Sequence, residues 1–371
     1  MPANRMNRDE FYTAMAPNDD ADLRKILWTL YWRGNAQVRE RIEDELRSPG
    51  QPKVKPKKEL PNPGAVLDEV TTFVGLAKDG AYMAGDRRVH HTERSRWRLT
   101  FRRLAGDALA ALHAEDPGPA QQAVAAMVDL ACDMKSYDYF HSDDPVEAAK
   151  FVVSDAVAVL WESVLRHDGF AAFTRRVPEQ LIRWESDYGW TRRGYGQVPE
   201  KEAALGVLLA RLLTTPDMWR TFARSYLDAL DAAGRADPGR PRTVYGSFDE
   251  TRYRRGERAR DLAAWHETLL DRFAGTPEDE LLDRLAVSPA LTGPELTFLR
   301  AQIAERRGDV ARAATLVTEC LNERPGDHEY LDFAVEVGAV LPPSAKEIRA
   351  ERAAAEALIA QAYQDGRISS D

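Results

Sequence analysis

Apolar residues recur at helical spacing through most of the chain. Leu23, Ile26 and Leu30 lie three and then four positions apart, which is the spacing of an amphipathic helix. A longer apolar stripe of the same kind runs through residues 146–164. We find no convincing apolar–polar alternation of the kind that marks a half-buried strand. The pattern therefore predicts an all-α protein.

Proline and acidic residues mark several predicted helix starts. A proline at the first helical position has no amide hydrogen to leave unpaired, and a preceding Thr or Asp can cap the free amides. Acidic residues in the first turn also meet the positive end of the helix dipole. The segments with this pattern begin at Asp143, Thr215, Thr276 and Gly293.

These signals divide the chain into five predicted parts. The first is a small helical hairpin whose first arm ends at Gly34. It is followed by a linker with five prolines and four lysines, which we interpret as either a solvated spacer or a contact for an anionic surface. A long Arg-rich loop then interrupts the helical body. The parts are the hairpin 1–47, the linker 48–63, the helical body 64–233, the loop 234–256 and the C-terminal helical segment 257–365.

One segment, residues 294–327, resembles a tetratricopeptide helical hairpin. Gly308 and Asp309 fit the tight turn between two helices, Ala313 and Cys320 are small where the helices cross, and Pro325 ends the second helix. Such a hairpin cannot bury its apolar face alone, so the resemblance implies stacked neighbours in an irregular, α-solenoid-like body. It also implies a concave groove that binds peptides or protein partners. The match covers about a tenth of the chain.

Composition and charge narrow the class of protein. The 371 residues carry a net charge of -9, which argues against a surface built throughout for nucleic acid, although a local basic patch stays open. The chain has no run of about 18 apolar residues and no apolar leader, so we expect no membrane span and a cytoplasmic location. Cys132 and Cys320 both fall among apolar residues, which argues against a disulfide framework or a zinc site. The excess of arginine over lysine and the abundant alanine suggest a GC-rich bacterial genome.

The most promising candidate interface is a segment rich in aromatic residues, arginine and glycine. Tyr, Trp and Arg dominate interface hot spots, and the same mixture can stack on single-stranded bases. Two further interpretations stay open, a plug at the ends of neighbouring helices and a site for another anion. The candidate binding residues are Trp184, Tyr188, Trp190, Arg192, Arg193 and Tyr195.

A second candidate contact lies in the N-terminal hairpin. Trp28 and Trp32 are four positions apart and therefore share one side of the predicted helix. A unit of about forty residues can barely stabilise itself, so this hairpin must dock. It could dock on its own chain or on a partner.

Residues that could carry catalytic or metal chemistry are sparse. His141 with Asp143 and Asp144 could hold a metal ion, or Ser142 or Asp143 could simply cap the helix that begins at Pro145. In the segment around His90 and His91, we expect Thr92 to be the helix cap. His266 lies one step off an apolar stripe and is expected to flank it. The arginines of residues 252–260 alternate with acidic residues, which favours a solvated helix start over a phosphate-binding track.

Together these patterns predict a non-enzymatic, cytoplasmic adaptor that binds an unidentified protein partner and needs no cofactor. One alternative is an enzyme or metal-binding protein that uses His141, Asp143 and Asp144. Another is a protein that associates with nucleic acid through Arg192, Arg193 and the arginines of residues 252–260. The sequence does not indicate an oligomeric state.

Overall fold

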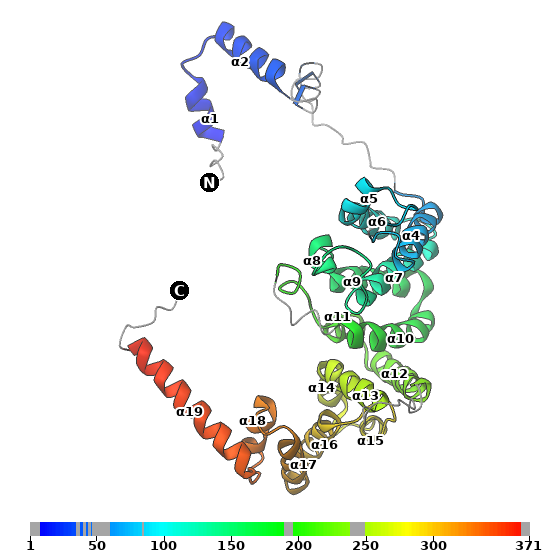
Figure 1. Ribbon diagram of the computed structural model, residues 1–371, viewed down its shortest axis with the longest axis vertical. Coiled ribbons are helices and arrows are strands. Elements are labelled where there is room, and N and C mark those ends of the chain that lie inside the picture. The colour runs from blue at the N-terminus through cyan, green and yellow to red at the C-terminus, as the bar shows by residue number, and fades with distance from the viewer. Residues whose placement is uncertain are drawn as a thin grey trace. The chain divides into compact units, whose positions relative to one another are not determined.

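The computed structural model describes residues 8–34, 38–39, 42–43, 46, 60–83, 85–188, 196–237 and 249–364. These residues form helices joined by turns and include no strand, so the prediction of an all-α protein is confirmed (Figure 1). None of the helices described here is long and apolar enough to cross a membrane. The chain divides into two compact units, Met1–Glu59 and Leu60–Asp371.

The first unit begins with two helices, α1 (Arg8–Met15) and α2 (Asp20–Arg33). The side chain of Asp19 caps α2 by accepting a hydrogen bond of 2.8 Å from the amide of Asp22. The helix ends at Gly34, as its sequence predicts. Most of the predicted second arm of the hairpin, residues 35–47, lies outside the described residues.

The second unit opens with helices that pack in a local bundle. Asn62 caps α4, its side chain accepting from the amide of Ala65 at 3.0 Å, while Pro63 takes the first helical position. Helix α4 packs against both α6 and α7. The aromatic rings of Trp97 and Phe140 stack within this bundle, with their centroids 4.2 Å apart. The helices here are α4 (Pro63–Lys78), α5 (His91–Ser95), α6 (Trp97–Ala111) and α7 (Gly118–Asp133).

The middle of the second unit is built around α10, which packs against both α12 and α7. Thr215 and Pro216 start α12 in the predicted manner, because the Thr215 hydroxyl accepts from the amide of Met218. The elements are α8 (Pro145–Ala149), α9 (Val153–Ser163), the π-helical turn η1 (Val164–Asp168), α10 (Phe170–Tyr188), α11 (Leu205–Leu212) and α12 (Pro216–Ala236).

The C-terminal helices show that the predicted loop 234–256 was drawn too long at both ends. Helix α12 continues to Ala236, and α13 begins at Glu250, where the Asp249 side chain caps it. The remaining helices are α13 (Glu250–Asp261), α14 (Ala263–Phe273), α15 (Glu280–Ala286), α16 (Pro294–Arg306), α17 (Val310–Glu323), α18 (His328–Glu336) and α19 (Pro343–Gln364).

Helix α16 belongs to two hydrophobic cores at once. Leu296, Leu299 and Ile303 join a core that extends back to Val66. On its other side, Phe298, Ala301 and Ala304 join a smaller core with residues of α17 and α18. Burial around most of its circumference explains why α16 lacks a clear polar face.

Candidate protein-interaction surfaces

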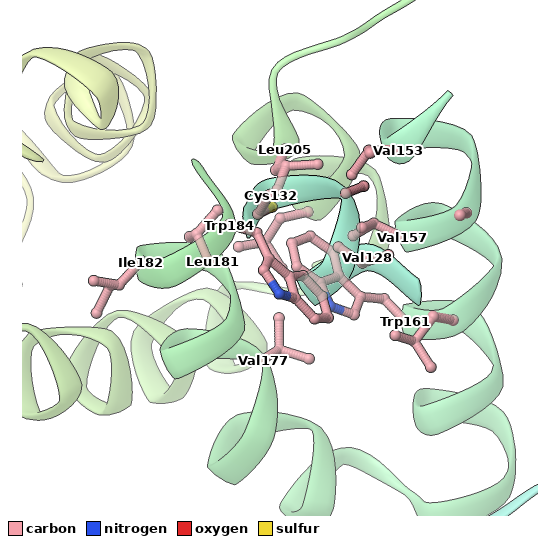
Figure 2. Close-up of a cluster of buried hydrophobic side chains, with 14 of the residues drawn as sticks. Val128, Cys132, Val153, Val157, Trp161, Val177, Leu181, Ile182, Trp184 and Leu205 are labelled. Carbon is pink, nitrogen blue, oxygen red and sulfur yellow. The ribbon is translucent and has the colours of Figure 1, made fainter. Parts of the chain in front are cut away.

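Trp184, which the sequence suggested as an interface residue, lies in the protein core. Its side chain is fully buried, and its indole Nε1 donates a hydrogen bond of 2.7 Å to the Asp129 carboxylate. Figure 2 shows it among apolar side chains that include Trp161 and Val177. The interface prediction is therefore wrong for Trp184, and the alternative of a structural plug describes it. The apolar spacing of Val177, Leu181 and Trp184 turns these side chains to one buried face of α10.

Polar contacts fix the residues next to Trp184. Arg183 pairs with Asp129 at 2.7 Å, and its guanidinium lies 5.6 Å from the Trp184 ring centroid. Glu185 is buried and accepts a hydrogen bond of 2.8 Å from the amide of Leu205, at the start of α11. The end of α10 is thus tied to both α7 and α11.

The other residues of this candidate site are Tyr188, Trp190, Arg192, Arg193 and Tyr195. Tyr188 ends α10, but its side chain and residues 189–195 lie outside the described residues. Their role in binding stays a prediction.

The chain is firmly anchored again just after these residues. Val198 is buried, and its amide donates to the Glu147 carboxylate at 2.8 Å. Glu202 accepts from the amides of Val153 and Ser154, at 2.7 and 2.9 Å, and so caps α9 from a distance in the sequence. Residues 189–195 therefore connect two well-fixed points of the second unit.

Helix α2 exposes an unusual amount of apolar surface. The side chains of Trp28 and Trp32 are 60% and 70% exposed, and their rings stack with centroids 5.8 Å apart. No residue of α2 is buried. We call the exposed apolar side chains of this helix the α2 surface: Ile26, Leu27, Trp28, Leu30 and Trp32.

The His141 cluster is arranged as a helix cap. His141, Asp143 and Asp144 are all exposed. Asp144, rather than the expected Ser142 or Asp143, caps α8 by accepting from the amide of Glu147 at 2.9 Å. Among the described residues no group of three or more His, Cys, Asp or Glu side chains could hold a metal ion.

Two other histidines differ from their predicted roles. His90, not Thr92, caps α5, with its Nδ1 accepting from the Thr92 amide at 3.4 Å. His266, expected to flank an apolar stripe, is buried, and its Nε2 lies 2.7 Å from the Tyr226 hydroxyl. Burial lowers the pKa of His266 to about 3, so the ring is neutral at physiological pH.

Arg252 and Arg254 at the start of α13 are exposed, and Arg254 pairs locally with Glu250, as the sequence suggested. Two later arginines of this helix are less solvated than expected. Arg258, only 13% exposed, and Arg255 both pair with Asp237 at 2.9 Å. Burial of Asp237 tends to raise its pKa, but the hydrogen bonds from Arg258 and Arg255 outweigh burial, and the net pKa is lowered. The pairs join the end of α12 to α13. No local sequence pattern predicts these two ion pairs, because Asp237 precedes Arg255 and Arg258 by 18 and 21 positions.

No protein-family model, curated protein or solved structure matches this chain. What the chain does must therefore be inferred from its own contacts.

Proposed function

We propose that this chain is a non-enzymatic, cytoplasmic adaptor that binds a partner protein through the α2 surface. The observation that carries the proposal is the exposure of five large apolar side chains on one helix that buries none of its own residues. Contiguous apolar surface of this kind marks interaction sites in soluble proteins. Trp28 and Trp32 are of a residue type that is enriched in binding hot spots, because each side chain offers a large rigid contact area and an indole N–H donor.

The partner surface that best fits α2 is an apolar groove, into which this helix would bind. An amphipathic helix binds such a groove through side chains three and four positions apart. Leu27 and Leu30 provide the step of three, and the pairs Ile26–Leu30 and Trp28–Trp32 provide steps of four. Charged residues at the ends of the helix, such as Asp20 and Arg33, would remain at the rim of the interface.

The second unit supports the proposal as a scaffold. We infer that it is an irregular helical-repeat body and that residues 294–327 form one tetratricopeptide-like hairpin. Gly308 has a φ of +80°, which suits a tight turn, and Ala313 and Cys320 are buried on α17. The Cys320 thiol lies 3.4 Å from the carbonyl oxygen of Pro294 on α16, so the two helices approach closely there. Repeat bodies commonly present surfaces to other macromolecules.

The cytoplasmic part of the proposal is supported by Cys320. This cysteine is buried and forms no disulfide bond. Unpaired thiols are typical of reducing compartments.

The test compares the full chain with its W28A/W32A variant in affinity capture from native-host lysate. We expect a stoichiometric partner whose recovery falls at least tenfold in the variant, because truncating two hot-spot residues typically costs several kcal/mol of binding energy. The matched control is L99A/L358A, which removes two exposed leucines from the second unit and should leave recovery unchanged.

Two biophysical measurements distinguish the other occupants of the α2 surface. If α2 docks on its own chain, W28A/W32A lowers the melting temperature of the purified protein. If it docks on a second copy, sedimentation of the wild type depends on concentration and that of the variant does not. Either result, without a partner lost from the capture, would contradict the proposal.

A further inference from the structure

A cavity of about 370 Å³ lies in the second unit between α7, α10 and the stretch of chain that runs from α9 into η1. This volume is near the lower end of the range for small-molecule sites. Each of the three walls supplies side chains that are four positions apart, so they lie along one side of their helix. The cavity therefore combines residues from three parts of the chain that only the fold brings together.

Two glutamines of this cavity are held in a fixed orientation. Gln121 is only 4% exposed, and its carboxamide donates to the Ser163 hydroxyl at 3.3 Å and accepts from Arg176 at 3.1 Å. The Oε1 atom of Gln180 accepts from the indole of Trp161 at 3.0 Å. Because an indole and a guanidinium can only donate, the two carboxamide oxygens must face them. The Nε2 of Gln180 is thus left to donate to another group.

The cavity also contains hydrogen-bonding groups that the protein itself does not use. Among the described residues, none accepts from Gln180 Nε2, and the carboxamide of Gln122 forms no hydrogen bond. Gln122 is exposed and Gln180 is half-buried, so a ligand can reach both. A primary carboxamide offers a donor and an acceptor side by side. These groups can therefore pair with a ligand edge that carries the complementary acceptor and donor.

The rest of the lining suits an uncharged ligand with flat apolar faces. Arg176 and Asp168 pair at 2.7 Å, and they are the only charged residues among the described residues that line the cavity. Asp168 ends the π-helical turn η1, and wide turns of this kind are frequent at functional sites. Leu160 and Val164 are buried and, with Ala125, give the walls an apolar surface. Since the two charges already neutralise each other, the cavity favours a neutral group over a phosphate or a metal ion.

We infer that this cavity binds an adenine base. Adenine presents a donor, N6, beside an acceptor, N7, and this edge matches the carboxamide of a glutamine. Gln122 provides this pair of hydrogen bonds, and Gln180 Nε2 donates to a ring nitrogen on another edge. The faces of the base pack on Leu160, Val164 and Ala125, as bases do when they are held between apolar side chains. The site lies within the second unit and does not depend on binding at the α2 surface.

The test is isothermal titration calorimetry of the full chain with adenosine and, in parallel, with guanosine. We expect saturable binding of adenosine. Guanosine should bind about tenfold more weakly, because guanine presents two acceptors where adenine presents a donor and an acceptor. The Q122L variant, which removes the carboxamide, should also weaken adenosine binding about tenfold. Gln122 is exposed, so this variant should keep the wild-type melting temperature.

The matched control is Q361L, the same change at an exposed glutamine of α19 that does not line the cavity. This variant should bind adenosine as tightly as the wild type. An equal loss in Q122L and Q361L would show that the cavity does not hold the base. That result, equal binding of adenosine and guanosine, or no binding of adenosine would overturn the inference.

Two further probes identify the form in which the base is bound. If AMP binds no more tightly than adenosine, the inference stands and the ligand is a nucleoside. If AMP binds more tightly, the inference stands and the ligand is a nucleotide. Tighter binding of a blocked trialanine peptide than of adenosine would instead assign the carboxamides to a peptide backbone and refute the inference.

Discussion

At the scale of single residues, the pair of Tyr226 and His266 shows how burial fixes protonation. Their hydroxyl and ring nitrogen lie 2.7 Å apart, and both side chains are buried in the large core. Burial raises the pKa of Tyr226 well above its usual value and lowers that of His266. Both groups are therefore neutral over the whole physiological range, and the hydrogen bond joins two uncharged partners.

This pair gives a prediction for stability against pH. In the unfolded chain His266 titrates near 6.5 and in the folded protein near 3, so between these values the unfolded state binds more protons. The free energy of unfolding therefore falls by about 1.4 kcal/mol for each pH unit below 6.5, and it stops falling near pH 3. Urea unfolding at pH 7 and pH 5 measures the slope.

The H266Q variant should show a shallower fall in unfolding free energy between these two pH values. H141Q, which changes an exposed histidine, provides the control and should retain the wild-type slope. Identical slopes for all three proteins would show that His266 does not carry the acid sensitivity.

At the scale of elements, close approach between backbones sets how α12 meets the segment before α16. Gly234 lies in α12, and a Cβ atom built on it would be 2.6 Å from the amide nitrogen of Ala290 and 2.8 Å from its Cα. These are backbone atoms, so they cannot move aside as a flexible side chain would. The Arg258 guanidinium donates to the Ala290 carbonyl oxygen at 2.9 Å and strengthens the same junction.

We therefore expect G234A to lower the free energy of unfolding by at least about 2 kcal/mol, because the added methyl group overpacks the junction. Gly106 in α6 provides a matched control, since a Cβ there would meet nothing within 4 Å. G106A should raise the free energy of unfolding by about 0.5–1 kcal/mol through better helix propensity. Denaturant unfolding of both variants tests the contrast, which fails if the two changes have the same sign.

At the scale of the whole molecule, the two units differ in how they are stabilised. Both hydrophobic cores draw their residues from the second unit, beginning at Val66. The helices of the first unit, α1 and α2, supply none of them. The second unit therefore contains the packing that it needs to fold without residues 1–59.

A chain shortened to residues 60–371 should keep a melting temperature within about 2 °C of the full chain. Circular dichroism on heating measures this directly. A much lower melting temperature would show that the first unit contributes to the stability of the second, and it would also weaken the proposal that the α2 surface serves a partner.

The sequence predicted the elements better than their associations. Helical spacing and caps such as Asn62 and Thr215 act within a few residues, so they can be recognised locally. Trp184 could not be placed in this way, because the same composition suits a buried plug and an exposed hot spot. Its burial depends on Asp129, 55 positions earlier. The buried state of His266 likewise depends on Tyr226, 40 positions away.

The ion pairs of Asp237 were missed for the same reason. The alternation of arginine with acidic residues in 252–260 suggested local neutralisation, yet Arg258 pairs instead with Asp237 across a gap in the sequence. Charge pairing of this kind follows from the packing of the helices rather than from local pattern.

The double role of α16 also orders how the protein can assemble during synthesis. Translation delivers α13, α14 and α15 before α16, and these helices all contact it. One side of α16 can therefore pack against these three helices while α17 and α18 are still inside the ribosome. Until they emerge, the other side of α16 exposes Phe298 and, further along the helix, two small residues, Ala301 and Ala304. The nascent chain therefore exposes little apolar surface on α16 at this stage. The smaller core then forms when α17 and α18 pack against a helix that is already in place.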